Sequence, residues 1–240
     1  MLLLLFDIDG TLVTRAGKAH AEALNGAIQE VHGVDARNLR ERINPAGRTD
    51  GEIARLILLG AGVSAERIDA RAGAVHAACC RFYAQHAPDD LSHTVLPGVR
   101  EVLAELSRRD GVILALLTGN YEPVARVKLR LAGIGDCFAP RQGAFGSDSE
   151  DRTVLPAIAR RRAGGAARPH PRQRTVVIGD TPRDIACARA DGVRCVAVAT
   201  GSYGVTELGA ADAVAATAGD LLGHLPRGAD TGREERGWLA

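Results

Sequence analysis

The chain has 240 residues, of which 46% are hydrophobic and 25% are charged, and its formal net charge is +1. This composition allows a sizeable globular core, and a charge so close to zero gives no support for binding to nucleic acid or to a membrane surface. The apolar run at the start is too short for a signal sequence or a membrane span. The five cysteines lack CxxC spacing, so we expect reduced thiols, as in the cytoplasm. The protein is expected to be a monomer or a homodimer.

Four short apolar runs are predicted to be strands. Residues 2–6 are continuously apolar, which indicates a strand that is buried on both faces. The other runs are "VILALLTGN" (112–120), "RTVVIGDTP" (174–182) and "RCVAVATG" (194–201). Helical patterns lie between them, at 99–109, 123–132 and 182–191. Strands that alternate with helices predict an α/β fold, a Rossmann-like parallel sheet between two layers of helices.

Residues 14–93 contain no convincing strand. Helical spacing is found at 18–31, 50–59 and 65–86, and Thr49 or Asp50 would cap the second of these helices. We interpret the segment as an all-helical cap domain, inserted into a core that consists of residues 1–13 and 94–226. The polar residues 227–240 are predicted to form a flexible C-terminal tail, and the Arg-rich residues 164–174 a solvated connection.

Three of the predicted strands end in polar, reactive residues. Asp7 and Asp9 follow the first, "TGN" (118–120) ends the second, and Asp180 and Asp184 follow the third. Loops at the carboxyl ends of parallel strands form ligand sites, and residues i and i+2 of an extended segment share a face. Carboxylates that meet there would repel unless a cation lies among them, and oxygen ligands without His or Cys favour Mg²⁺. Such a site suits a phosphoryl group, with one aspartate as nucleophile and another as acid and base.

In this order the motifs resemble those of the haloacid dehalogenase superfamily, whose members are mostly phosphatases. "FDIDGTL" resembles its first motif, "LLTGN" its second and "VIGDTPRD" its fourth. The helical insert lies where the family's first type of cap lies, and it resembles the caps of phosphoglycolate phosphatase and β-phosphoglucomutase. The resemblance implies Mg²⁺-dependent hydrolysis of a small phosphorylated metabolite through an aspartyl-phosphate.

The resemblance also implies a role for each motif residue. Asp7 would be the nucleophile, and Asp9 would protonate the leaving oxygen and then activate water. Mg²⁺ would be bound by Asp7, by the backbone carbonyl of Asp9 and by Asp180, while Asp184 would orient these ligands or reach the metal through water. The phosphoryl oxygens would be held by residues at the end of the second strand, namely Thr118, Gly119 and Asn120.

The third motif departs from the family's usual Lys-Pro. The corresponding stretch reads "GAFGSDSEDRTVLPAIA", with Arg152 at about the right place and no proline after it. A cation is needed because the nucleophile and the phosphate are both negative, and Lys128 is the other candidate. In the insert, Arg48 could contact a carboxylate or second phosphate of the substrate, whereas His20 is expected at the surface or in packing.

Three other functions share part of this pattern. A phosphomutase of the β-phosphoglucomutase kind would use the same residues, but it must shield its aspartyl-phosphate from water. A phosphonate hydrolase would need a lysine in the cap that forms a Schiff base, and Lys18 is the one lysine of the insert. An inactive binding module would usually have lost a catalytic carboxylate, and this chain has all of them.

Overall fold

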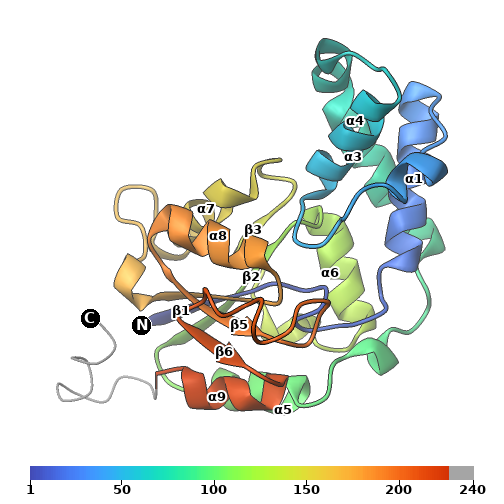
Figure 1. Cartoon of the computed structure of the whole chain (residues 1–240). Helices are drawn as coiled ribbons and strands as arrows, with labels where there is room; N and C mark the ends of the chain where they lie inside the picture. The colour runs from blue at the N-terminus through green and yellow to red at the C-terminus, as the bar shows by residue number, and fades with distance from the viewer. Residues whose placement is uncertain (227–240) are drawn as a thin grey trace.

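The computed structural model describes residues 1–226, so the predicted tail at 227–240 lies outside the described residues. At its centre is a six-stranded sheet in the order β3-β2-β1-β4-β5-β6, and every neighbouring pair is parallel. Helices cover both faces of the sheet (Figure 1). The predicted α/β fold is therefore confirmed. The strands are β1 (Leu2–Phe6), β2 (Val112–Thr118), β3 (Ala144–Phe145), β4 (Thr175–Gly179), β5 (Arg194–Val198) and β6 (Ala213–Ala215).

The helices fall into two groups along the chain. Those of the insert between β1 and β2 are α1 (Lys18–His32), α2 (Arg37–Arg40), α3 (Asp50–Gly60) and α4 (Ala65–His86). Those that follow are α5 (Val99–Ser107), α6 (Glu122–Leu131), α7 (Leu155–Gly164), α8 (Pro182–Asp191) and α9 (Leu221–His224). A short 3₁₀ turn, η3 (Arg152–Val154), leads into α7.

Strand β1 is buried on both faces, as its continuous apolar sequence predicts. Leu4 and Phe6 face one apolar cluster, to which α5, α6 and α9 contribute. Leu3 and Leu5 face a second cluster, which contains residues of α7 and α8. Alternate side chains of one strand thus anchor both layers of helices, and the end of β1 is held firmly in the middle of the sheet.

The insert has an apolar core of its own, formed by α1, α3 and α4. Tyr121 and Val124, at the start of α6, belong to the same cluster, so the insert rests on α6 at one side of the sheet (Figure 1). The domain boundaries given above stay a prediction. Among residues 1–226, no helix has the length and apolar character that crossing a membrane would require.

Candidate active site

The three adjacent strands β2, β1 and β4 are parallel, so their carboxyl ends lie on the same side of the sheet. Asp7 directly follows β1, and its N–H donates to the carbonyl of Ile178 in β4 at 2.8 Å. Thr118 ends β2, and Asp180 follows β4. Carboxylate oxygens of Asp7, Asp180 and Asp184 lie within 4.8 Å of one another, and all three residues are buried. The structure thus brings together three of the four acids singled out in the sequence.

The carboxylate of Asp180 fits between two glycines. A Cβ atom at Gly10 or at Gly201 would overlap the Asp180 side chain. Gly10 also has φ of +91°, a conformation that glycine adopts without strain. On the same side, the hydroxyl of Thr11 donates to Oδ1 of Asp180 at 3.3 Å. The glycine of the first motif therefore leaves room for an acid that comes from the fourth.

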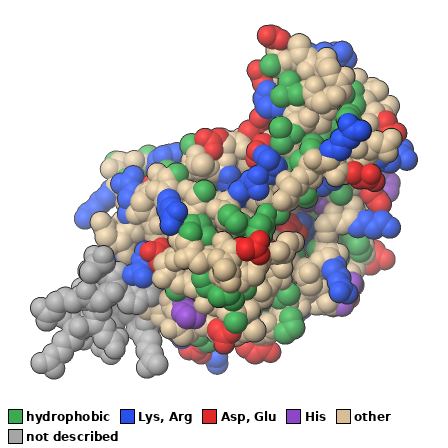
Figure 2. Space-filling model, in the orientation of Figure 1, with side chains coloured by type: hydrophobic (Ala, Val, Ile, Leu, Met, Phe, Trp, Pro, Cys, Tyr) green, Lys and Arg blue, Asp and Glu red, His purple; other side chains and the backbone are tan. Residues whose placement is uncertain are grey.

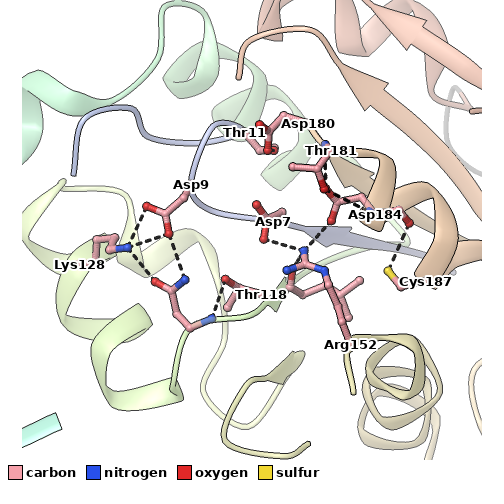
Figure 3. Close-up of polar contacts among 12 residues, drawn as sticks. Asp7, Asp9, Thr11, Thr118, Lys128, Arg152, Asp180, Thr181, Asp184 and Cys187 are labelled. Carbon is pink, nitrogen blue, oxygen red and sulfur yellow. Dashed lines mark hydrogen bonds and ion pairs between the residues drawn. The ribbon is translucent and has the colours of Figure 1, made fainter. Parts of the chain in front are cut away.

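Arg152 is the cation beside Asp7. From η3 its Nη2 atom donates to Oδ1 of Asp7 at 2.9 Å and to Oδ1 of Asp184 at 2.5 Å (Figure 3). It also lies 3.4 Å from the carbonyl of Leu117. The Nε atom of Arg152 is buried and has no hydrogen-bond partner among the described residues. Of the two cations considered for the third motif, Arg152 is the one that contacts Asp7.

Asp184 is engaged through both of its oxygens. Oδ1 accepts from Arg152, while Oδ2 accepts from the N–H of Thr181 at 3.0 Å and from its hydroxyl at 2.7 Å. The hydroxyl of Thr181 in turn accepts from the N–H of Asp184, so the two residues form the capping box that begins α8. Asp184 therefore ties the first turn of α8 to Arg152 and has little freedom to move towards a ligand.

Asp9 points away from this acidic cluster. Both of its oxygens accept from Nζ of Lys128, at 2.9 and 2.8 Å, and Oδ2 also accepts from the side-chain amide of Asn120 at 3.0 Å. Nζ of Lys128 donates to Oδ1 of Asn120 at 2.7 Å as well. Asp7 and Asp9, two residues apart, thus have separate cationic partners (Figure 3).

These surroundings shift the pKa values of Asp7 and Asp9 in opposite directions. Burial raises the pKa of Asp7 despite Arg152, and the charge of Asp184 adds to the increase. Burial, with the charges of Asp7 and Asp184, likewise raises the pKa of Asp180. Burial acts in the same sense on Asp9, but the charge and hydrogen bonds of Lys128 outweigh it and lower the pKa of Asp9.

The donor set fits a hard divalent cation. Asp7 and Asp180 are buried carboxylates whose mutual repulsion a cation would relieve, and oxygen ligands are those that Mg²⁺ prefers. Asp184, with both oxygens engaged, is better placed to orient Arg152 than to bind a metal directly.

The insert contacts the site through the loop before α3. The carbonyl of Arg48 lies so close to Gly119 that a Cβ atom there would overlap it. The Arg48 guanidinium pairs with Glu52 and donates to the carbonyl of Asn44 at 3.1 Å. From α8, Arg183 donates to the carbonyl of Ala46 at 2.9 Å. Figure 2 shows basic side chains at the junction between the insert and the rest of the molecule.

Asp50 joins the insert to the loop that ends β2. Its N–H donates to the carbonyl of Gly119 at 2.8 Å, and its Oδ2 accepts from the N–H of Tyr121 at 2.7 Å. The same oxygen lies 3.0 Å from Nε2 of His20. The adjacent Thr49 caps α3 by accepting from the N–H of Glu52, so Asp50 is left free to bind across the junction.

Glu150 provides a second link, next to Arg152. Its carbonyl accepts from the hydroxyl of Thr49 at 2.7 Å, and its carboxylate pairs with Arg55 of α3 at 2.5 and 3.1 Å. Arg55 also binds Asp69 of α4 at 2.6 Å. The segment that leads into the turn with Arg152 is therefore attached to α3 directly and to α4 through Arg55.

Sequence reasoning did not assign Asp50, Glu150 or Arg183 to the site. Two of them had a usable signal, since Arg183 lies inside the fourth motif and Glu150 lies two residues before Arg152. Asp50 had none beyond its capping position, because its partner Tyr121 is 71 residues away along the chain.

The sequence model of the haloacid dehalogenase-like hydrolases matches residues 1–192 of the chain. The chain belongs to this family. The match contains the helical insert together with the motifs around Asp7, Thr118, Arg152 and Asp180. The resemblance drawn from the motifs and the expectation that the protein is an enzyme are both confirmed.

Curated relatives of this haloacid dehalogenase-like hydrolase include two enzymes named phosphoglycolate phosphatase. The one from Rhodospirillum rubrum is 30% identical over 245 residues, which cover 94% of this chain and 92% of the relative. The one from Mesorhizobium japonicum is 28% identical over 211 residues, which cover 85% and 84%. The similarity extends over nearly the whole of each chain.

Solved structures of family members share the fold. CbbY from Rhodobacter sphaeroides, crystallised with phosphate, aligns with a TM-score of 0.63 at 23% identity, over 92% of this chain and 96% of that one. A β-phosphoglucomutase from Clostridium difficile has the same TM-score at 18% identity, over 92% and 93%. These alignments support the haloacid dehalogenase-like architecture.

Proposed function

We propose that the protein is a Mg²⁺-dependent phosphatase that hydrolyses a small phosphate monoester through an aspartyl-phosphate on Asp7. The observation that carries the proposal is the separation of Asp7 from Asp9. Asp7 lies with Arg152 and two acids, where a phosphoryl group and a cation can meet it. Asp9 lies on the other side with Lys128 and Asn120, and 41% of its side chain is exposed.

The reaction has two steps. Because the pKa of Asp9 is lowered in the free site, Asp9 must take up a proton when the substrate binds. In the first step, a carboxylate oxygen of Asp7 attacks phosphorus, the bond from phosphorus to the ester oxygen breaks, and Asp9 gives its proton to that oxygen so that an alcohol leaves. In the second, water attacks the aspartyl-phosphate while Asp9 takes a proton from it. The bond from phosphorus to Asp7 then breaks, and its electron pair returns to the carboxylate. Asp9 ends with the proton it began with, and inorganic phosphate leaves.

Other residues stabilise the charge that develops on phosphorus. Arg152 contacts Asp7 through Oδ1, which leaves Oδ2 for the attack and places a cation beside the phosphoryl oxygens. The hydroxyl of Thr118 and the backbone at Gly119 and Asn120, at the end of β2, would bind those oxygens. Asp7 and Asp180 would hold Mg²⁺, and Asp184 would help to orient these ligands. When bound, Mg²⁺ would neutralise phosphate charge.

A substrate that carries a second anionic group fits the junction with the insert. Burial lowers the pKa of Arg48, and the charge of the nearby Arg183 lowers it further. Two neighbouring guanidiniums attract a carboxylate or phosphate. The curated relatives are named phosphoglycolate phosphatase, and phosphoglycolate is a small phosphate monoester with a carboxylate. We therefore propose it as the first substrate to test.

The test is phosphate release from a panel of small monoesters that includes phosphoglycolate, with Mg²⁺ and with EDTA. The proposal expects release that requires Mg²⁺ and disappears in Asp7→Asn. Arg48→Ala should raise KM for phosphoglycolate more than for an uncharged alkyl phosphate. Absence of release from every ester would contradict the proposed function.

The same panel separates the alternatives. Interconversion of glucose 1-phosphate and glucose 6-phosphate without net release would indicate a mutase. Binding of Mg²⁺ with no turnover would indicate an inactive module. The phosphonate hydrolase depends on Lys18, which is exposed at the start of α1, and trapping of phosphonoacetaldehyde with borohydride tests it.

A further inference from the structure

Among residues 1–226, Lys128 is the most deeply buried Lys or Arg that contacts a catalytic candidate. Of the 30 Lys and Arg residues of the chain only two are lysines, Lys18 and Lys128. The Lys128 side chain is fully buried, whereas Asp9, to which it pairs, keeps 41% of its side chain exposed. The ion pair is therefore one-sided, with its cation inside the protein and its carboxylate turned towards the solvent side of the site.

The partners of Lys128 account for all of its donors. An ammonium has three N–H groups, and Nζ lies within hydrogen-bond distance of both oxygens of Asp9 and of Oδ1 of Asn120. The amide of Asn120 closes the cluster by donating to Asp9. Because no donor is left, Lys128 cannot also bind a phosphoryl oxygen without losing one of these contacts.

A purely structural explanation of this cluster is weak. Burying an ammonium costs several kcal/mol, on the order of what good partners can offset, and a well-packed apolar pair often serves stability as well. Here the carboxylate partner is partly exposed, so removal of the cation would not strand a fully buried charge. The cluster instead fixes geometry. Lys128 and Asn120 together donate three hydrogen bonds to the Asp9 carboxylate, and these hold it in one orientation.

We propose that Lys128, together with Asn120, is a positioning residue that holds the Asp9 side chain where it takes the proton from the attacking water. The proposal rests on the proposed function and concerns its second step. In that step the water oxygen bonds to phosphorus, its proton goes to Asp9, and the bond to Asp7 breaks. A misoriented Asp9 would slow this hydrolysis and leave the aspartyl-phosphate to accumulate.

An aryl ester isolates this step. p-Nitrophenolate leaves without needing a proton, so formation of the aspartyl-phosphate from p-nitrophenyl phosphate does not require Asp9. Rapid-mixing absorbance then reports the first step as a burst of nitrophenolate and the second as the steady rate. If Lys128 acts only in the second step, its loss lowers kcat and KM together and leaves kcat/KM unchanged.

The variant is Lys128→Met, which removes the charge and keeps a side chain of similar length. We expect a burst of nitrophenolate approaching one per active site, then a steady rate lower by about 100-fold, the lower end of the effect of general acid–base groups. Asn120→Ala, which leaves the Lys128–Asp9 pair, should give a smaller change in the same direction. If Lys128→Met does not fold, Asn120→Ala tests the positioning of Asp9 on its own.

Arg160→Met is the matched control. Arg160 forms a buried ion pair with Asp191 at 2.6 and 2.9 Å, between α7 and α8 and apart from the site residues. This variant should lower thermal stability, while kcat per folded enzyme and the size of the burst stay as in wild type. It separates the loss of a buried ion pair in general from the loss of the one that holds Asp9.

The outcomes are distinct. A wild-type enzyme that releases no nitrophenolate with Mg²⁺ overturns the proposed function and this proposal with it. A wild type that turns over, with a Lys128→Met variant that shows no burst and an equal fall in kcat and kcat/KM, overturns the positioning role alone.

Discussion

Asp50 of α3 accepts a hydrogen bond from the backbone N–H of Tyr121, which precedes α6, at 2.7 Å. Both residues are buried. Asp50 also donates its own N–H to Gly119 at 2.8 Å, so the insert and the loop after β2 are joined by a reciprocal pair of contacts. Asn120, which binds Asp9, lies between the two bonded residues of that loop.

Replacing Asp50 should therefore destabilise the protein in a graded way. Asp50→Ala leaves the buried N–H of Tyr121 without an acceptor, and we expect a loss of about 1–3 kcal/mol in the free energy of unfolding. Asp50→Asn retains an acceptor oxygen and should lose less. Urea denaturation measures both, and equal losses in the two variants would show that the acceptor itself contributes nothing.

Arg152 should be indispensable for turnover. Arg152→Ala removes the cation that contacts Asp7 and Asp184, and we expect kcat/KM to fall by about 100- to 1,000-fold, as when a donor to a developing anion is lost. Arg152→Lys should recover part of the rate, because the charge remains while the planar fork is lost. Arg160→Ala controls for removing a buried arginine, and full activity in Arg152→Ala would contradict the assignment.

Without metal, the acidic cluster should make stability decline as pH rises. Burial raises the pKa values of Asp7 and Asp180 in the folded protein, and repulsion from neighbouring carboxylates, Asp184 above all for Asp7 and Asp7 for Asp180, raises them further. Above about pH 4, where an ordinary aspartate ionises, the folded state therefore binds more protons than the unfolded state. The free energy of unfolding falls with pH across that interval, until the folded-state carboxyls have also ionised.

The measurement compares wild type with Asp180→Asn in EDTA from about pH 5 to about pH 8. The variant should gain stability relative to wild type as pH rises. Burial lowers the pKa values of His32, His76 and His170, so these residues make stability rise with pH. Their contributions are the same in wild type and variant and cancel in the comparison. Mg²⁺ should stabilise wild type more at high pH, because it binds ionised carboxylates. A difference that does not change with pH would contradict this account.

The Arg55–Glu150 pair should affect catalysis through the turn that carries Arg152. Arg55→Met removes the side-chain link between α3 and Glu150 but keeps the hydrogen bond from Thr49, and we expect kcat/KM to fall by about fivefold, equivalent to roughly 1 kcal/mol. Arg81→Met is the control, because Arg81 pairs with Glu30 at an exposed position within the insert and should change little. Equal effects of the two variants on kcat/KM would rule out a link through Glu150.

Much of the fold could be predicted because the buried strands are continuous apolar runs. Strands β1, β2, β4 and β5 lie within the predicted segments, and α8 begins and ends as predicted. Strands β3 and β6 were not predicted. With two and three residues they are too short to show any periodicity, and they form by pairing at the two edges of the sheet.

For the candidate site, the sequence identifies the acids but not all of their partners. Asp7, Asp9 and Asp180 follow apolar runs and are visible as motif residues. That Lys128 binds Asp9 depends on how α6 packs against the end of β1, across 119 residues of chain. No local pattern records such a contact. The sequence shows that Lys128 is a cation, but it does not show that its partner is Asp9.

The double-sided burial of β1 has a consequence for hydrogen exchange. With β2 and β4 as neighbours and an apolar cluster on each face, the amides of Leu3 to Phe6 should exchange with solvent only when the whole sheet unfolds. Amides of the insert should open at lower cost, because its apolar cluster is distinct from the two clusters that cover β1. Local opening of the insert would then leave the strand that anchors Asp7 intact.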